Sequence, residues 1–161
     1  MKTVRAIALD VDGVLTDGGV WWGPDNQEWK RFSYVDIMGV SLGTKAGLLF
    51  GLISGEDSPL VDRFAAKMGI ALVEKNCKDK AAALRRFSAA TGIPLSEFAF
   101  MGDDVNDLAG MALAGLAAAP ATAQLAAKQA ASFVAQAAGG HGAVRELVDA
   151  VLAAREGKPS S

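Results

Sequence analysis

Acidic side chains crowd a short segment near the N-terminus. Residues 10–17, Asp-Val-Asp-Gly-Val-Leu-Thr-Asp, hold three aspartates and directly follow an apolar run, Val4–Leu9. Side chains alternate along an extended chain, so Asp10 and Asp12 point to the same side. One carboxylate could attack a phosphorus atom, while the other protonates the leaving oxygen and later activates water. This spacing therefore suits a nucleophile with an acid/base partner.

Further candidate residues lie at the same edge of the expected sheet. Ser54, Gly55 and Glu56 end the second strand, and Gly102, Asp103 and Asp104 end the fourth. Lys80 lies at the start of the helix after the third strand, and Asp107 follows the fourth strand by one helical turn. The carboxyl ends of parallel strands meet at one edge of a sheet, which is where ligands bind in such folds. Crowded carboxylates repel each other unless a cation neutralises them, and oxygen ligands without His or Cys favour Mg²⁺. A lysine and a hydroxyl opposite the cation would complete a site for a phosphoryl group.

The elements that must position these residues alternate between apolar strands and helices. The expected strands are 4–9, 48–54, 71–74, 97–102, 115–119 and 132–135. The expected helices are 36–46, a second one ending near 68, 79–91, 105–114, one that opens at Pro120, and 142–154. Apolar strands separated by helices predict an α/β fold with a mostly parallel sheet covered on both faces. An aromatic-rich segment, Val20–Ser33, predicts a protruding β-hairpin around a Pro-Asp-Asn turn.

Length and composition narrow the class of protein. A chain of 161 residues suits one domain, 1–161, with a tail from about 156 to 161 that we expect to fray. A net charge of −2 gives no reason to expect nucleic acid or an anionic membrane as partner. The single cysteine, Cys77, and the lack of a long apolar segment favour a cytoplasmic protein.

Taken together, the motifs resemble those of the haloacid dehalogenase (HAD) superfamily of phosphohydrolases. The resemblance rests on Asp10-Val-Asp-Gly, Ser54-Gly, Lys80 and Gly102-Asp-Asp-Val-Asn-Asp, in that order. The segments TDGG, EWKRFSYVDIMG and AGGHGAVRE resemble a small branch without a large cap domain. That branch includes 3-deoxy-D-manno-octulosonate (KDO) 8-phosphate phosphatase and enzymes for nine-carbon (nonulosonate) 9-phosphates. The resemblance covers roughly residues 4–152 and implies a Rossmann-like HAD fold.

The resemblance also implies a role for each motif residue. Asp10 would be the nucleophile, forming an aspartyl-phosphate, and Asp12 the general acid/base. Mg²⁺ would bind to Asp10, Asp103 and the backbone carbonyl of Asp12. The remaining motif residues would bind phosphate (Ser54, Gly55, Lys80) or support the site (Asp104, and Asp107 by orienting Lys80 or metal-bound water).

The resemblance to this branch also implies a class of substrate and an oligomeric state. Enzymes for KDO 8-phosphate usually carry arginine where this chain has Glu56, so a nonulosonate 9-phosphate is slightly favoured over KDO 8-phosphate. The pathway would then be lipopolysaccharide or sialic acid biosynthesis. Other candidate substrate contacts are Lys67, His141 and Arg145, the last of which could instead pair with Glu56. The resemblance further implies a homotetramer joined through the hairpin.

Other interpretations remain open at this point. A lone aspartate such as Asp17 or Asp36 fits a turn or helix cap as well as a functional site. A phospho-receiver domain also combines clustered aspartates with a hydroxyl and a lysine, but it accepts phosphate after its third strand, where residues 74–77 contain no aspartate. A catalytically silent oligomerisation domain would have lost the nucleophile or a metal-binding acid, and this chain keeps both.

Overall fold

The structure is a computed structural model that describes residues 1–157. Its centre is a six-stranded sheet with the order β5-β4-β1-β6-β7-β8, in which every neighbouring pair is parallel. The strands are β1 (Ala6–Asp10), β4 (Leu49–Ile53), β5 (Leu72–Glu74), β6 (Phe98–Met101), β7 (Leu116–Ala119) and β8 (Phe133–Val134). This arrangement confirms the predicted α/β class, and no large cap domain is found among the described residues.

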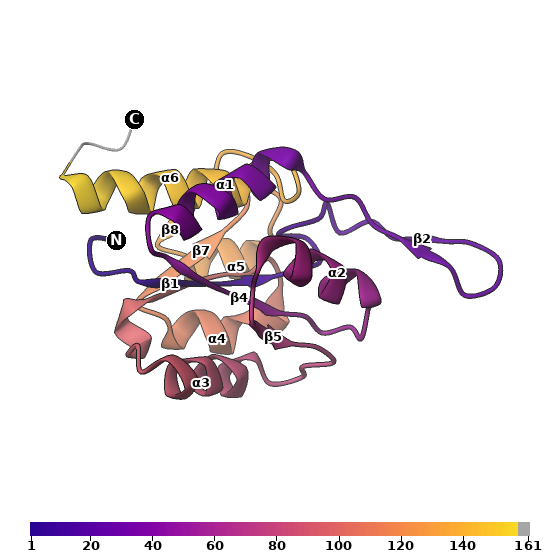
Figure 1. Cartoon of the computed structure of the whole chain (residues 1–161), viewed down its shortest axis with the longest axis horizontal. Coiled ribbons are helices and arrows are strands. Elements are labelled where there is room, and N and C mark those ends of the chain that lie inside the picture. The colour runs from indigo at the N-terminus through magenta and orange to yellow at the C-terminus, as the bar shows by residue number, and fades with distance from the viewer. Residues whose placement is uncertain (158–161) are drawn as a thin grey trace.

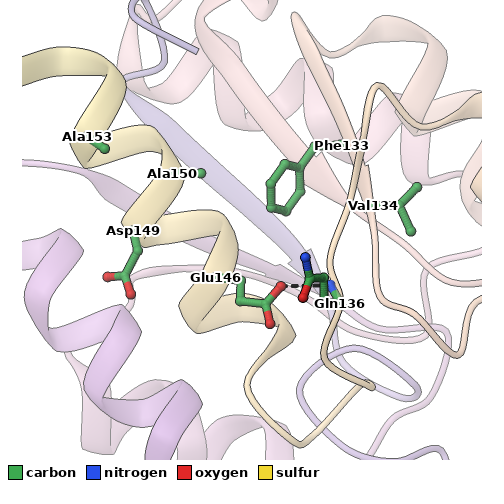
Figure 2. A pocket seen from close by; sticks show the side chains of 7 residues that line it. All are labelled: Phe133, Val134, Gln136, Glu146, Asp149, Ala150 and Ala153. Carbon is green, nitrogen blue, oxygen red and sulfur yellow. Dashed lines mark hydrogen bonds between the residues drawn. The ribbon is translucent and has the colours of Figure 1, made fainter. Parts of the chain in front are cut away.

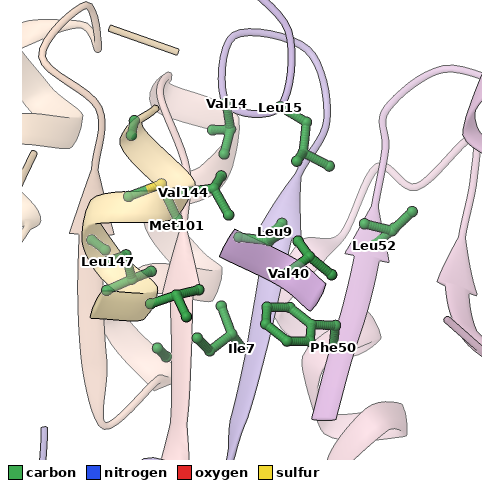
Figure 3. Close-up of a cluster of buried hydrophobic side chains, with 14 of the residues drawn as sticks. Ile7, Leu9, Val14, Leu15, Val40, Phe50, Leu52, Met101, Val144 and Leu147 are labelled. Carbon is green, nitrogen blue, oxygen red and sulfur yellow. The ribbon is translucent and has the colours of Figure 1, made fainter. Parts of the chain in front are cut away.

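Helices cover both faces of the sheet (Figure 1). One face carries α1 (Tyr34–Lys45), α2 (Pro59–Met68) and α6 (Ala143–Glu156), and the other carries α3 (Lys80–Thr91), α4 (Leu108–Leu113) and α5 (Leu125–Ala130). Figure 3 shows the core of the first face, where Ile7 and Leu9 of β1 lie against Val40 of α1 and Leu147 of α6. Because apolar side chains point to both faces, the central strands are buried along their length. The packing of these strands fixes the position of the polar residues that follow their carboxyl ends.

The predicted hairpin is present and projects from the body of the molecule (Figure 1). Its strands, β2 (Trp21–Trp22) and β3 (Glu28–Trp29), are antiparallel. Asp25 and Asn26 turn the chain with φ angles of 61° and 57°, a conformation that these two residue types tolerate better than most. The tryptophans remain exposed, Trp22 at 79%.

Several predicted boundaries are wrong. The first helix begins at Tyr34 with Ser33 as its N-cap, so Asp36 does not cap it. Pro120 does not open a helix: the backbone N–H of Gln124 donates to the carbonyl of Asp103 (2.7 Å), and α5 begins only after that. The segment 105–114 divides into a short 3₁₀ turn, Val105–Asp107, and α4, and a second such turn, Leu95–Glu97, precedes β6.

The last helix also extends beyond its predicted end. Helix α6 continues to Glu156, past the predicted end at 154, and is followed by Gly157 in the left-handed conformation. Arg155 donates two hydrogen bonds to the carbonyl of Val4 (3.1 and 2.6 Å), which ties the last turn to the start of β1. The rest of the predicted tail, 158–161, lies outside the described residues. Within the described part of the chain, no helix is both long and apolar enough to cross a membrane.

Candidate active site

The predicted site residues meet at the carboxyl edge of the sheet. Asp10 ends β1, Ser54 follows β4, and Asp103 lies two residues after β6, while Lys80 is the first residue of α3. Strands β4, β1 and β6 are neighbours in the sheet, so their ends lie side by side. The parallel order of the strands thus brings together residues that are up to 93 positions apart (from 10 to 103).

Lys80 joins two of the aspartates. Its side chain is 1% exposed, and its Nζ donates to Asp10 Oδ1 (2.6 Å) and to Asp107 Oδ1. Burial disfavours the charge of Lys80, but the two carboxylates outweigh this effect and raise its pKa. Asp107 Oδ2 in turn accepts the backbone N–H groups of Asp103 (2.8 Å) and Asp104 (3.2 Å). Asp107 therefore orients Lys80 and the loop after β6 at the same time.

Three carboxylates form a compact cluster beside this lysine. Oxygen atoms of Asp10, Asp103 and Asp107 all lie within 4.8 Å of one another. Burial raises the pKa of Asp10 well above its usual range, although Lys80 opposes the effect. Burial, followed by the charge of Asp107, raises the pKa of Asp103 to about 6. A bound cation would stabilise the charged form of these aspartates, and a set of oxygen ligands alone fits Mg²⁺.

Gly13 lets the acidic loop approach this cluster. Its φ of +91° favours glycine, and a Cβ at this position would clash with the carboxylate of Asp103. The backbone of the Asp-x-Asp-Gly segment can therefore lie directly against Asp103.

Ser54 is fully buried at the end of β4. Its Oγ accepts the backbone N–H of Glu56 (3.1 Å), and its carbonyl accepts that of Cys77 (2.9 Å). Accepting one hydrogen bond leaves the hydroxyl able to donate its own hydrogen. The carbonyl of Gly55 accepts a hydrogen bond from Lys78 Nζ (3.0 Å), which fixes the loop after β4.

One residue at the site was missed by the sequence analysis. Lys30 reaches back from the base of the hairpin, and its Nζ lies 2.8 Å from Asp12 Oδ1 and 3.4 Å from Glu28 Oε1. The sequence does contain a signal, because residues 28 and 30 share one side of an extended segment. This aromatic-rich segment was interpreted only as a contact between subunits, so Lys30 was overlooked.

Lys67 lies on the wall of a cavity that Lys30 also lines. The cavity measures about 210 Å³ and is lined by Lys30, Phe32, Ile37, Leu60, Arg63, Phe64 and Lys67. Phe32 of the hairpin base stacks on Phe64 of α2, with ring centroids 4.8 Å apart. The cavity therefore combines an apolar wall with three basic side chains.

Two other predicted substrate contacts have partners of their own. Arg145 pairs with Asp149 one turn further along α6 (2.7 Å), not with Glu56. His141 Nδ1 lies 2.9 Å from the carbonyl of Gly139, and its Nε2 lies 2.7 Å from Arg31 Nη2. Since Arg31 can only donate, Nε2 must accept, so the hydrogen of this imidazole is on Nδ1. His141 thus links the loop that contains Gly139 to Arg31 at the base of the hairpin.

Asp36 caps a helix that is distant in sequence. Its carboxylate is 1% exposed and accepts the backbone N–H groups of Gly142 (3.0 Å), Val144 (3.0 Å) and Arg145 (3.1 Å). These donors belong to the N-terminus of α6, so Asp36 has a structural role in the fold. Asp17 accepts the N–H of Gly19 (2.9 Å), as expected for a turn residue.

A larger cavity, of about 350 Å³, lies between β8 and α6 (Figure 2). Figure 2 shows Glu146 reaching across it to the backbone N–H of Gln136 (2.7 Å). Its described lining contains none of the predicted site residues. The chemistry therefore belongs to the sheet edge, not to this cavity.

Comparisons with known proteins show to which family this chain belongs. The family model of haloacid dehalogenase-like hydrolases matches residues 58–147. The 3-deoxy-D-manno-octulosonate 8-phosphate phosphatase KdsC of Haemophilus influenzae Rd is 33% identical over 160 residues, which cover 99% of this chain and 88% of that protein. The chain belongs to the haloacid dehalogenase-like hydrolases. KdsC of Escherichia coli K12 is 32% identical over 154 residues, covering 96% of this chain and 82% of the relative.

Solved structures of this family have the same fold. A 3-deoxy-D-manno-octulosonate 8-phosphate phosphatase from Moraxella catarrhalis, in complex with magnesium, phosphate and KDO, superposes with a TM-score of 0.93 at 32% identity, covering 96% of this chain and 89% of that one. The cobalt-bound Haemophilus influenzae enzyme also gives 0.93 at 32%, covering 96% and 91%. The expected fold and the expected class of enzyme, a phosphatase of the HAD family, are confirmed. The receiver and silent-domain alternatives are thereby rejected.

Proposed function

We propose that this phosphatase uses Mg²⁺ to hydrolyse the phosphate monoester of a 3-deoxy-2-keto sugar acid through an aspartyl-phosphate at Asp10. The observation that carries the proposal is the meeting of Asp10, Lys80, Asp103 and Asp107 at one edge of the sheet. Buried carboxylates beside one lysine are the donor set that a divalent cation and a phosphoryl group require together.

In this proposal Asp10, Asp103 and the carbonyl of Asp12 hold Mg²⁺, which supplies positive charge to neutralise the aspartates and the phosphoryl oxygens. Lys80 holds Asp10 Oδ1 and adds a second positive charge. Ser54, with its free hydroxyl hydrogen, and the backbone N–H groups of its loop bind the remaining phosphoryl oxygens.

The reaction proceeds in two steps. A carboxylate oxygen of Asp10 forms a bond to phosphorus as the P–O bond to the sugar breaks, and Asp12 gives its proton to the departing alkoxide. Asp12, now a carboxylate, then accepts a proton from a water molecule whose oxygen attacks phosphorus as the bond between phosphorus and the Asp10 oxygen breaks. Inorganic phosphate leaves, and Asp10 and Asp12 return to their starting states.

The substrate class is supported by the relatives' names and by the charge of the neighbouring cavity. The relatives named above are phosphatases for KDO 8-phosphate, a compound with a carboxylate as well as a phosphate. The basic residues Arg63 and Lys67 on the wall of the cavity suit such a second anionic group. The relatives do not confirm the preference for a nine-carbon acid, which stays a prediction based on Glu56.

A panel assay tests the substrate class. We expect phosphate release from KDO 8-phosphate and from nonulosonate 9-phosphates with a kcat/KM at least tenfold above that for glucose 6-phosphate, which lacks the carboxylate. A chain that hydrolyses glucose 6-phosphate equally well would contradict the proposed substrate class.

Asp10→Asn tests the nucleophile. Because a carboxamide cannot form the acyl-phosphate, we expect activity to fall by at least 10³-fold while the protein stays folded. Acid quenching with radiolabelled substrate should leave label on the wild-type chain and none on the variant. Asp17→Asn is the matched control, since its side chain lies in a turn outside the cluster. An active Asp10→Asn variant would remove the aspartyl-phosphate from the proposal.

Glu56→Arg tests substrate choice. Glutamate at this position repels a carboxylate and accepts hydrogen bonds from hydroxyls, so the reversal of charge should move the ratio of kcat/KM for KDO 8-phosphate to that for a nonulosonate 9-phosphate by about tenfold or more. Asp57→Arg makes the same charge change at the next residue, which is exposed and pairs with Lys75. If wild type prefers KDO 8-phosphate, or both variants move the ratio equally, Glu56 is not the selector.

Assembly into a tetramer is proposed from the exposed hairpin. Trp21, Trp22 and Trp29 are each at least half exposed on an element that projects from the body. Such a cluster of aromatic side chains is typical of a surface covered by another subunit.

A further inference from the structure

The side chain of Lys30 is buried although the residue lies at the base of an exposed hairpin. Its side chain is only 4% exposed, while the tryptophan before it is half exposed. Burying an ammonium group is costly unless charged partners surround it. Two carboxylates do so here, Asp12 at 2.8 Å and Glu28 at 3.4 Å.

The second of these carboxylates is itself anchored. Glu28 Oε1 accepts a hydrogen bond from Ser58 Oγ (2.8 Å), and Ser58 is the N-cap of α2, where its Oγ accepts the N–H of Leu60 (3.3 Å). Ser58 is also buried. A continuous chain of contacts therefore runs from a rigid helix end through Glu28 and Lys30 to Asp12. Held at both ends, the lysine has little freedom to leave Asp12.

We propose that Lys30 is a positioning residue for Asp12. By holding Oδ1, Lys30 presents Oδ2 of Asp12 to the leaving oxygen of the substrate. The inference rests on the proposed function, in which Asp12 gives its proton to the sugar alkoxide as the P–O bond breaks. Lys30 keeps its own proton and its charge throughout, and it acts only by fixing the direction of the Asp12 carboxyl group. The hairpin thus belongs to the catalytic machinery as well as to assembly.

Two aryl esters separate this role from substrate binding. p-Nitrophenyl phosphate releases a stable anion that needs little help from a general acid, whereas phenyl phosphate, of similar size, needs more. Neither ester carries a carboxylate. The parameter to compare is kcat/KM, because it covers only the steps up to departure of the leaving group.

We expect Lys30→Met to lower kcat/KM for phenyl phosphate about tenfold more than for p-nitrophenyl phosphate. Lys30→Arg should restore most of the loss, because its guanidinium can still donate to Asp12. In an Asp12→Asn background, Lys30→Met should leave the ratio of the two esters unchanged. An equal loss on both esters, or a further change of the ratio in the Asp12→Asn background, would overturn the assignment.

Two further variants keep the test independent of folding. Glu28→Gln loosens Lys30 without removing it, and it should change the ratio in the same direction by a smaller factor; if Lys30→Met does not fold, this variant decides. Arg31→Met is the matched control: Arg31 is the next residue and anchors the hairpin to the carbonyl of Gly140 (2.9 Å). It should affect both esters by the same factor. A wild-type enzyme that releases phosphate from neither these esters nor KDO 8-phosphate overturns the proposed function together with this inference, whereas equal effects of Lys30→Met on the two esters overturn only the inference.

Discussion

Asp36→Ala should be among the most damaging single substitutions outside the site. The Asp36 carboxylate on α1 accepts three backbone N–H groups at the start of α6, and two of these bonds, to Gly142 and Val144, are fully buried. Alanine has no side-chain acceptor, so both buried donors lose their partner. Helix α6 lies beside α1 on one face of the sheet, so the loss falls on a central contact of the fold (Figure 1).

The size of the effect follows from these contacts. An unsatisfied buried donor costs about 1–3 kcal/mol, so the two buried donors together cost about 2–6 kcal/mol. The third donor, that of Arg145, is partly exposed and can be hydrated. Burial raises the pKa of Asp36 despite the three hydrogen bonds, so removing the charge recovers part of the loss. We therefore expect the free energy of unfolding to fall by about 3 kcal/mol.

Urea unfolding, followed by far-ultraviolet circular dichroism at one fixed protein concentration, measures this difference. With a slope of about 2 kcal/mol per molar urea, the midpoint should fall by about 1.5 M. Asp149→Ala is the matched control, because it removes an exposed carboxylate from the same helix and should cost at most about 0.5 kcal/mol. If the two variants unfold within about 0.5 kcal/mol of each other, the argument that Asp36 holds α6 is refuted.

The remaining predictions concern the cation and the assembly. Chelation should abolish activity and Mg²⁺ should restore it, with Ca²⁺ a poor substitute because it prefers more ligands at longer distances; full activity after exhaustive chelation would contradict a metal site. Because burial raises the pKa of Asp103 to about 6, protons compete with the cation below that pH, and the half-saturating Mg²⁺ concentration in the activity assay should rise up to tenfold per pH unit between pH 6 and 5. The folded protein binds this proton more tightly than the unfolded chain does, so the metal-free protein should lose stability as pH rises from about 4 through 6. Added Mg²⁺ should restore the lost stability, and thermal unfolding at the two ends of this pH range measures both effects. Sedimentation should show a tetramer, and Trp22→Ser should shift it toward smaller species; a wild-type monomer at micromolar concentration would argue against assembly through the hairpin.

Much of the site could be predicted from the sequence, because its residues follow local patterns. A carboxylate directly after an apolar run must lie near the end of a buried strand, and the parallel order of such strands makes their ends meet. This reasoning predicts Asp10 and Asp103, while Lys80 at the start of a helix and Asp107 one helical turn after Asp103 follow from their place beside the same strand ends; the structure places all four together. The alternation of strands and helices is equally local, so the fold class could be predicted too.

Element boundaries were harder, because contacts from distant segments decide them. Helix α6 continues through Arg155 because that side chain reaches the carbonyl of Val4 at the other end of the chain. The start of α5 depends on the backbone contact between Gln124 and Asp103, which no property of Pro120 reveals.

The sequence by itself determined which residue types stand at the strand ends, and with them the chemistry that this protein can perform. Only the tertiary structure decided which of the other polar residues join that chemistry. Asp36 and Lys30 are both polar residues near the hairpin, yet one caps a helix 106 residues away and the other contacts Asp12. The physical reason is that a charge buried on folding must find its partner in three dimensions, and the partner lies on whichever element the packing of the core brings within hydrogen-bonding distance.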